Sequence, residues 1–310
     1  MNTVSLTVVI PTYARSEILR LTLQGLCAQN NLNDLQEVIV VSDGHDELAA
    51  AVALRFSHHL PIRYLEQPKR GVSAARNLGI SAANSSVIVL LDDDVIPHPD
   101  FIAEHAKFHN KNPDMRSVLL GRVTWHPELE ITPFMEWYGE RGALFGFGLL
   151  KDGSRADPRY FYSCNISFKR EFFITNGGFN KTLTVLEDNE LGHRLSQDGM
   201  QLEFRQSALG YHYQTFTFAQ ACKRLERYSH GLDSFLTTPA GKVLAKKRRR
   251  WFFRLAEIAV RLTAPLLRNF LPVLDGRRRL PNFFYRLMYW YYGAYLSFWA
   301  RADKRLIRGK

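Results

Sequence analysis

The sequence is poor in cysteine and has no apolar run long enough to cross a bilayer. Its three cysteines, Cys27, Cys164 and Cys222, lie far apart and match neither a disulfide framework nor a zinc-ligand spacing, so a reducing compartment is expected. No cationic segment followed by an apolar one opens the chain, which argues against a secretory signal. The longest uncharged apolar stretch near the C-terminus, 287–300, is too short for a membrane span. These absences predict a cytoplasmic protein.

Most of the chain also lacks an excess of positive charge. Residues 241–310 hold 18 Lys and Arg against 3 Asp and Glu, a net charge of +15, whereas the whole chain carries +11. Residues 1–240 are therefore slightly acidic. A hydrophobic content of 46% is typical of a globular protein, and 310 residues suffice for one large α/β domain with an appendage.

Apolar, β-branched runs alternate with helical periodicity in the first hundred residues. Strands are predicted at 6–10, 37–41, 62–65 and 85–91, and helices at 15–29, 47–56 and 71–83. This alternation predicts an α/β fold with a doubly wound, mostly parallel sheet flanked by helices. Ligands bind at the C-terminal ends of strands in such sheets, so the residues that follow each strand are the first candidates for a site.

Three adjacent aspartates, Asp92, Asp93 and Asp94, follow the fourth predicted strand. Because they repel one another, they need a cation or a network of hydrogen-bond donors. Oxygen ligands suit Mg²⁺ or Mn²⁺, whose coordination shell substrate phosphates often complete. In an extended backbone Asp92 and Asp94 would point the same way and Asp93 the opposite way. A solvated acidic turn is the alternative.

Other strand ends and one helix add candidates for nucleotide binding. Asp43 follows the second strand and is expected either to accept hydrogen bonds from a base or ribose, or to form a turn before Gly44. The helix that begins at Gly71 carries Arg76 and Asn77, both long enough to reach a nucleotide, although a surface helix is the alternative.

Four segments in this order resemble the nucleotide-sugar glycosyltransferases of family 2, which have the GT-A fold: VVIPTYAR (8–15), VSDG (41–44), GVSAARNLG (71–79) and LDDD (91–94). The resemblance extends over about residues 4–215 and implies a catalytic domain at 1–215, with a nucleotide-binding half to about residue 100 and an acceptor half beyond it. It implies that Asp93 contacts the sugar, that Asp92 and Asp94 hold Mn²⁺ or Mg²⁺, and that the nucleotide is bound by Pro11, Thr12, Tyr13, Arg15, Asp43, Arg76 and Asn77. Ser42 stands where the family often has a further acidic residue, so the base stays open, with a UDP-linked sugar as the first expectation.

The segment from Leu186 to Leu195 resembles the family's catalytic-base segment. On that resemblance Asp188 is the base that deprotonates an acceptor hydroxyl, and Glu187 contacts a sugar. A helix N-cap is the alternative for Asp188. Sugar contacts are also expected from Gly178 and Asn165, and the stretch 121–157 is expected to be a mobile loop facing the acceptor. His212 is expected either to complete the metal shell or to be structural.

Residues 216–310 are expected to form a helical, basic and aromatic appendage. Segments 246–262 and 283–299 combine Trp, Tyr and Phe with clustered Lys and Arg, which is typical of helices lying on an anionic membrane surface. Packing on the catalytic domain or on a second subunit is the alternative, so a homo-oligomer stays open. Nucleic acid is not an expected partner, because no recognition fold accompanies the charge.

The sequence thus predicts an inverting, metal-dependent glycosyltransferase that moves one sugar from a nucleotide sugar to a hydroxyl of a lipid-linked or membrane-proximal glycan, at the cytoplasmic face of a membrane. The Gln-x-x-Arg-Trp signature of processive synthases is absent, since Leu225 follows Arg224, which favours single or few additions. Two other classes stay open: a non-catalytic scaffold that binds membrane or nucleic acid, and a metal-dependent nucleotidyltransferase.

Overall fold

A computed structural model describes residues 4–142, 144–247, 275–276 and 280–291 of the chain. The chain divides into two compact units. Unit 1 comprises Met1–Leu129, Phe147–Thr182 and Glu187–Gln214, and unit 2 comprises Glu130–Gly146, Leu183–Leu186 and Thr215–Lys310. The predicted limit of the catalytic domain at residue 215 concerns function and stays a prediction.

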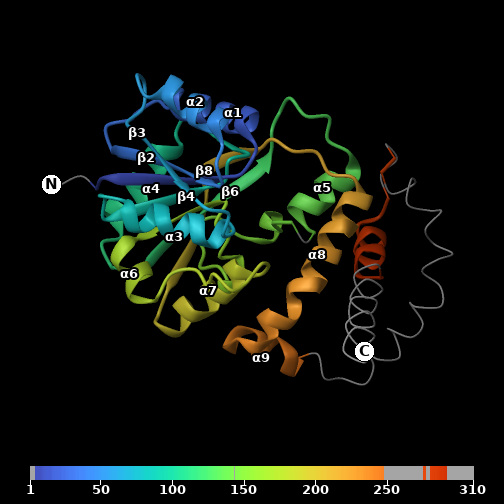
Figure 1. The fold of residues 1–310 in the computed structure, drawn as a ribbon. Coiled ribbons are helices and arrows are strands. Elements are labelled where there is room, and N and C mark those ends of the chain that lie inside the picture. The colour runs from blue at the N-terminus through green and yellow to red at the C-terminus, as the bar shows by residue number, and fades with distance from the viewer. Residues whose placement is uncertain (1–3, 143, 248–274, 277–279, 292–310) are drawn as a thin grey trace. The chain divides into compact units, whose positions relative to one another are not determined.

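Unit 1 is built around an eight-stranded sheet in the order β3-β2-β1-β4-β7-β6-β8-β5 (Figure 1). Strands β3, β2, β1 and β4 are parallel, as predicted, and the almost wholly buried β1, β2 and β4 are apolar runs of the kind that fill such a sheet. In the second half β7 is antiparallel to β4 and β6, β5 is antiparallel to β8, and β6 is parallel to β8. The strands are β1 Leu6–Thr12, β2 Leu35–Asp43, β3 Ile62–Gln67, β4 Val87–Leu91, β5 Val95–Pro97, β6 Ser117–Trp125, β7 Asn165–Lys169 and β8 Gln201–His212.

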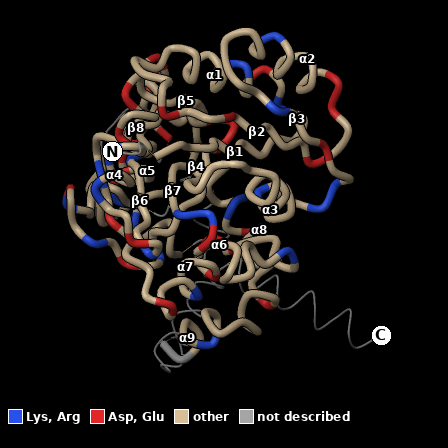
Figure 2. Tube along the Cα trace, turned by 90° about the vertical axis from the view of Figure 1, so that its left-hand side faces the viewer, with Lys and Arg blue, Asp and Glu red and all other residues tan. Residues whose placement is uncertain are grey.

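Helices cover both faces of this sheet. Figures 1 and 2 show α1 and α2 on one side of β1, β2 and β4, and α3 and α6 on the other. Helix α3 approaches the sheet closely, because a Cβ at Gly79 would lie 2.4 Å from Val9 Cγ1. The helices of this unit are α1 Ser16–Cys27, α2 Glu47–Phe56, α3 Val72–Ala82, α4 Phe101–Lys111, α6 Arg170–Thr175 and α7 Glu187–Gln197.

The prediction of a continuous mobile loop over 121–157 is wrong. Residues 121–125 belong to β6, Pro133–Glu140 form α5 behind the side-chain cap of Thr132, and two short 3-10 turns follow at Phe147–Leu149 and Pro158–Tyr160. Gly121 interrupts the strand pattern in the sequence, but the packing requires it, since a Cβ at this position would lie 2.3 Å from the amide nitrogen of Asn165.

Unit 2 is helical and has an aromatic core. It contains α5, α8 Phe218–Thr237, α9 Pro239–Lys247 and a helix over residues 282–291. Phe134 and Tyr138 on α5 stack on each other at 5.3 Å between ring centroids, and Phe218 and Tyr285 pack against Phe134. Thr217 and Gln220 form a capping box at the start of α8. Gln220, which begins the segment Gln220 to Arg224, thus stabilises a helix end.

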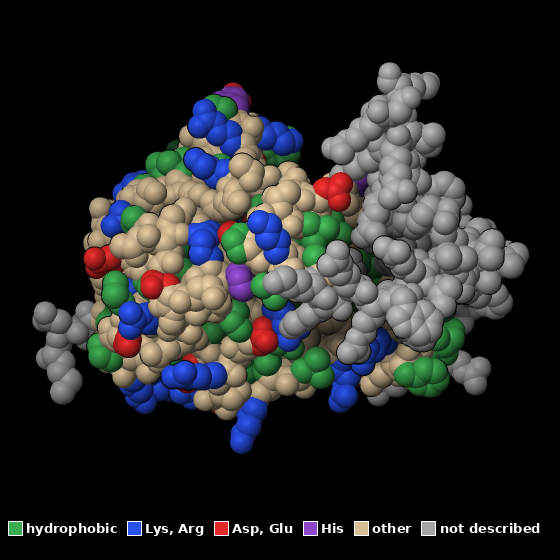
Figure 3. Space-filling model, turned by 90° about the horizontal axis from the view of Figure 1, so that it is seen from below, with side chains coloured by type: hydrophobic (Ala, Val, Ile, Leu, Met, Phe, Trp, Pro, Cys, Tyr) green, Lys and Arg blue, Asp and Glu red, His purple; other side chains and the backbone are tan. Residues whose placement is uncertain are grey.

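Most of the basic C-terminal segment lies outside the described residues. This applies to the side chains of the predicted helix 246–262 and to 292–299 of the second aromatic segment. On the face drawn in Figure 3, Lys and Arg side chains stand singly or in small groups among neutral and acidic ones. Within the part of the chain that the structure describes, no helix combines the length and apolar character of a membrane span.

Candidate active site

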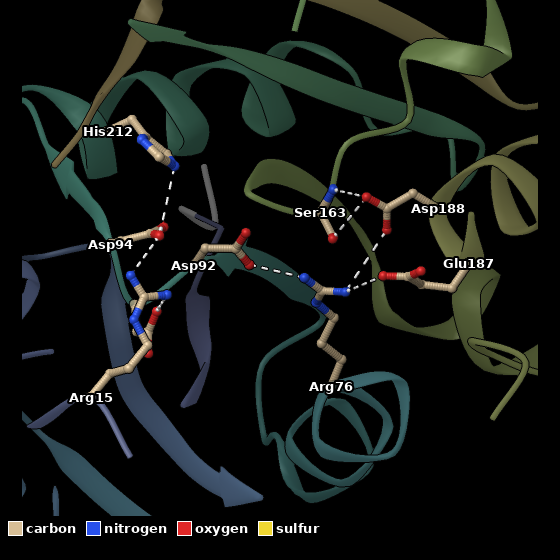
Figure 4. A network of polar contacts seen from close by, with 9 residues as sticks. Arg15, Arg76, Asp92, Asp94, Ser163, Glu187, Asp188 and His212 are labelled. Carbon is tan, nitrogen blue, oxygen red and sulfur yellow. Dashed lines mark hydrogen bonds and ion pairs between the residues drawn. The ribbon is translucent and has the colours of Figure 1, made fainter. Parts of the chain in front are cut away.

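The three aspartates after β4 form a turn. The backbone N–H of Val95 donates to the carbonyl of Asp92 at 3.1 Å, and the N–H of Asp92 donates to the carbonyl of Cys164 at 3.3 Å. The predicted extended geometry is therefore wrong, because the backbone bends directly after Leu91. As a result Asp93 and Asp94 turn towards one arginine and Asp92 towards another (Figure 4).

Arg15, between β1 and α1, pairs with the second and third aspartates. Its Nη1 lies 3.0 Å from Asp93 Oδ1 and its Nη2 lies 2.8 Å from Asp94 Oδ2. Thr12 Oγ1 donates to the other oxygen of Asp93 at 2.8 Å. Burial raises the pKa of Asp93 to about 7 even though Arg15 opposes this shift. Compensation by donors, one of the two solutions expected for the acidic run, is thus present.

Asp94 also faces His212 at the end of β8. His212 Nε2 lies 3.6 Å from Asp94 Oδ2, because β5 pairs with β8 in the register Val95 to His212. Both residues are buried. Of the three predicted metal ligands, the structure brings these two together and turns Asp92 away. Across the described ranges, no group of three or more His, Cys, Asp or Glu side chains is arranged to hold a metal ion.

Arg76 on α3 connects the acidic turn with the start of α7. Its side chain is only 6% exposed; Nη2 donates to Asp92 Oδ1 at 2.9 Å, while Nη1 lies 3.4 Å from Glu187 Oε1 and 3.9 Å from Asp188 Oδ1 (Figure 4). Burial alone would lower the pKa of Arg76, but these three carboxylates more than offset it and raise the pKa. A buried guanidinium with this much opposite charge stays protonated.

Asp188 lies in the first turn of α7 and is fixed by one serine. Both the backbone N–H and the hydroxyl of Ser163 donate to Asp188 Oδ2, at 3.1 and 3.0 Å. Burial raises the pKa of Asp188 to about 7; Arg76 and Ser163 oppose the shift and Glu187 adds to it. A carboxylate with a pKa near neutrality suits a general base at physiological pH.

Backbone strain occurs beside both charged groups. Among the described residues, the two non-glycine residues with a positive φ are Ala14 at 51° and Leu186 at 60°. They directly precede Arg15 and Glu187. Such conformations are costly for residues with a Cβ and are often found at functional sites.

Asp43, the predicted contact to the nucleobase, forms hydrogen bonds with other residues of this chain. Its carboxylate is buried and accepts from the backbone N–H groups of Arg70 and Gly71 and from Gln67 Nε2, at 2.7 to 3.1 Å. It thereby holds the loop that leads into α3. This contact was not predicted, because residues 43 and 70 come together only in the folded sheet.

Three other predicted ligand contacts have structural partners. The amide of Asn77 donates to the carbonyl of Phe179 at 2.8 Å and accepts from its N–H at 2.9 Å. Gly178, with a φ of 66°, lies so close to Asn77 that a Cβ would come within 2.8 Å of its Oδ1. Asn165 is fully buried, and its amide donates to the carbonyls of Arg122 and Ala208.

The remaining nucleotide candidates differ in exposure. Pro11 and Thr12 are buried at the end of β1, whereas Tyr13 is 47% exposed and carries Lys69 Nζ at 3.9 Å from its ring centroid. The side chain of Arg15 is 41% exposed. Tyr13, Lys69 and Arg15 thus offer the accessible polar and aromatic groups at this strand end.

Sequence reasoning missed the role of Ser163. The residue lies 25 positions before Asp188, and no spacing rule connects a turn residue before a strand with the first turn of a later helix. A buried cluster of His105, His109 and Ser167 was missed for the same reason.

The parallel half-sheet with an acidic turn at its edge, a buried arginine and a carboxylate of raised pKa characterises an α/β protein with a charged, largely buried candidate site. Residues 7–171 match the family model described as Glycosyl transferase family 2, which is more than half of the chain. The chain belongs to this family, which confirms the resemblance predicted from the sequence and supports the predicted enzyme class.

Relatives of this chain include proteins named as synthases and as glycosyltransferases. Chondroitin synthase from Escherichia coli is 26% identical over 239 residues, 67% of this chain and 34% of that protein. Validoxylamine A glucosyltransferase from Streptomyces hygroscopicus subsp. jinggangensis is 29% identical over 230 residues, 66% and 54% of the two chains. Glucosyl-dolichyl phosphate glucuronosyltransferase from Haloferax volcanii is 29% identical over 182 residues, 56% and 55%. The chain therefore spans about a third to just over half the length of these relatives.

Solved structures confirm the GT-A fold. The mannosyltransferase PcManGT from Pyrobaculum calidifontis, solved with GDP-Man and Mn²⁺, matches with a TM-score of 0.65 and 18% identity over 100% of this chain and 89% of that one. The S. aureus protein TarS in complex with UDP-GlcNAc matches with a TM-score of 0.54 and 14% identity over 76% and 67% of the two chains.

Proposed function

We propose that this glycosyltransferase moves one sugar, with inversion, from a UDP-linked donor to a hydroxyl of a lipid-linked or membrane-proximal acceptor, and that Asp188 is its base. The observation that carries the proposal is the buried Arg76, which lies within 3.9 Å of Asp92, Glu187 and Asp188 and so connects the acidic turn with the base. Sugar transfer needs the acidic turn, which would bind the donor, and the base, which would act on the acceptor, within one site.

The residues at the acidic turn fit a divalent cation. Asp94 and His212 offer a carboxylate oxygen and an imidazole nitrogen 3.6 Å apart, a pair of donors that suits Mn²⁺ and leaves positions for substrate phosphates. Asp94 and His212 would hold the ion, and Asp92 lies in the same turn. When bound, the cation neutralises charge on the leaving diphosphate. Arg15 adds a second positive group at this edge.

Asp188 supplies the proton acceptor. Its carboxylate takes the proton of the acceptor hydroxyl, the hydroxyl oxygen bonds to the anomeric carbon, and the nucleoside diphosphate leaves with the electron pair of the broken bond. A single base acting on the acceptor, with no enzyme nucleophile, inverts the anomeric centre. Glu187 lies beside the base, placed to contact a sugar hydroxyl.

Nucleotide titration tests the donor proposal. We expect UDP to bind more tightly than GDP, dTDP or CDP by calorimetry, to bind more tightly still with Mn²⁺, and to lose the metal effect in Asp94→Ala. Asp100→Ala, which changes an exposed aspartate that follows the motif in the sequence, is the control. Tight binding of a different nucleoside diphosphate would change the identity of the donor's nucleobase. Consumption of a nucleoside triphosphate without sugar transfer would favour a nucleotidyltransferase.

An exposed apolar helix face supports a membrane-proximal acceptor. In unit 2, Phe283, Leu287 and Trp290 lie at helical spacing and are 69, 52 and 43% exposed, whereas Tyr285 and Met288 on the opposite face are buried. Arg286 is exposed on the same helix, which belongs to the sequence segment 241–310 with its net charge of +15. Basic groups around an apolar face complement an anionic lipid surface.

Vesicle flotation tests this contact. We expect the protein to float with phosphatidylserine-containing vesicles and less with phosphatidylcholine alone, and the variant Phe283→Ser/Leu287→Ser/Trp290→Ser to lose flotation. Leu54→Ser, which removes a leucine of unit 1 that is 70% exposed, should float as the wild type does. Unchanged flotation of the triple variant, or a change of its mass in light scattering from dimer to monomer, would assign the face to another role.

A further inference from the structure

The two oxygens of Asp188 have different surroundings. Oδ2 accepts two hydrogen bonds, both from Ser163. Oδ1 has no hydrogen-bond donor among the described residues and lies 3.9 Å from Arg76 Nη1, an ion-pair distance beyond hydrogen bonding. The carboxylate is therefore held on one side, and its second oxygen is a buried acceptor without a donor among the described residues.

Ser163 belongs to a segment that is anchored to the acidic turn. The next residue, Cys164, accepts the backbone N–H of Asp92 at 3.3 Å, and Asn165 is paired with Leu91 in the register of β7 and β4. The hydroxyl of Ser163 is fully enclosed, since the residue is 1% exposed. The same three residues thus fix the position of the base relative to Asp92.

We propose that Ser163 is a positioning residue for the base: it holds Asp188 Oδ2 with two donors, so that Oδ1 is the atom that takes the acceptor's proton. This inference rests on the proposed function. In the transfer step the acceptor O–H bond breaks, its proton bonds to Oδ1, the acceptor oxygen bonds to the anomeric carbon, and the nucleoside diphosphate departs with the bonding electrons. Ser163 keeps both of its own protons throughout.

The proposal has a specific kinetic signature. Ser163→Ala removes one of the two donors and leaves the backbone N–H. Because hydrogen bonds stabilise the ionised carboxylate, we expect the acid limb of the kcat profile to move to higher pH by about one unit and kcat at high pH to fall about 10- to 100-fold. The KM for the nucleotide sugar should stay unchanged, because the Ser163 hydroxyl donates to Asp188 in the described part of the chain and is not proposed to contact the donor.

Three variants make the experiment decisive. Ser163→Cys keeps a weak donor of similar size and should recover part of kcat and of the limb position. Ser154→Ala removes an exposed serine hydroxyl that bonds only to Lys151 O and should behave as wild type. Asp188→Asn separates the two proposals, since it must abolish transfer if Asp188 is the base.

Each outcome has one meaning. An active Asp188→Asn enzyme would overturn the assignment of the base itself. An inactive Asp188→Asn enzyme together with a wild-type pH profile in Ser163→Ala would overturn the role of Ser163 alone. A uniform loss of kcat with an unmoved acid limb would show that Ser163 does not act through Asp188. Urea unfolding of each variant shows whether it is folded under the assay conditions. If Ser163→Ala does not fold, Ser163→Cys replaces it in the comparison.

Discussion

The guanidinium of Arg76 lies 3.9 Å from Asp188 Oδ1, and the same group donates to Asp92 Oδ1 at 2.9 Å. One buried cation therefore balances carboxylates that belong to two ends of the site. The Arg76 side chain on α3 is only 6% exposed, so water cannot solvate the three carboxylates in its place if the guanidinium is removed. The electrostatic balance of the acidic turn and that of Asp188 are thus linked through a single side chain.

Removing Arg76 should destabilise the fold as well as inactivate it. Arg76→Met leaves Asp92, Glu187 and Asp188 without their buried cation, so we expect a loss of about 3–5 kcal/mol in the free energy of unfolding, measured in urea at neutral pH. Arg20→Met, which breaks an exposed pair with Glu17, should cost less than about 1 kcal/mol. A loss below about 1 kcal/mol for Arg76→Met would mean that the carboxylates do not depend on it.

The rate of sugar transfer should rise with pH through about 7. Asp188 acts as a base only when ionised, and burial raises its pKa to about 7, so the protonated, inactive form dominates below that pH. The logarithm of kcat should increase with unit slope at acid pH and level off above about 8. A profile that is flat between pH 5 and 8 would contradict the raised pKa.

The first half of the fold was predictable because its signals are local. Each of the strands that became β1, β2 and β4 is a short β-branched run between turn residues, and parallel order follows from the helices between them. The antiparallel pairing of β7 with β4 and β6 was not predictable, since it joins segments far apart in the chain. At Asp92 the sequence left an extended backbone and an acidic turn open, and the structure has the turn, with Asp93 and Asp94 buried instead of solvated.

The candidate site was predicted by residue more than by contact. Asp94 and His212 lie 3.6 Å apart, whereas the approach of Arg76 to Asp188 was not predicted. The carboxylate of Asp43, by contrast, binds the loop before α3. Ser163 meets Asp188 only because the turn before β7 lies beside the start of α7 in the folded chain. Both contacts depend on long-range geometry that no single segment contains.

Asp43→Asn should loosen the entry to α3. The amide nitrogen of asparagine would face a backbone N–H of Arg70 or Gly71, where the carboxylate now accepts, so one donor is left unsatisfied. We expect a loss of about 1–3 kcal/mol in the free energy of unfolding and a higher KM for the donor, from urea titration and initial rates. Asp46→Asn, which keeps an acceptor for the N–H of Ala49 at the start of α2, should cost less. Equal stability of the Asp43 variant and the wild type would show that the loop does not need this carboxylate.

A buried pair of histidines should make the protein sensitive to mild acid. Asn165 donates through its amide nitrogen to two carbonyls, so its Oδ1 accepts from His105 Nε2; His105 Nδ1 then accepts from Ser167 Oγ, which in turn accepts from His109 Nε2. This chain holds both rings neutral.

Burial lowers the pKa of His105 to about 4, and it also lowers that of His109, whereas an unfolded histidine titrates near 6.5. The unfolded chain therefore binds more protons between these values, so the stability is fully present above about pH 6.5 and is lost as the pH falls towards 4. For His105 alone we expect a loss of about 2 kcal/mol in the free energy of unfolding between pH 7 and pH 5, measured in urea. His105→Gln has no titrating ring and should reduce this pH dependence, whereas His58→Gln, which changes an exposed histidine, should leave it unchanged. Equal loss of stability in wild type and His105→Gln over the same pH range would show that acid acts on other groups.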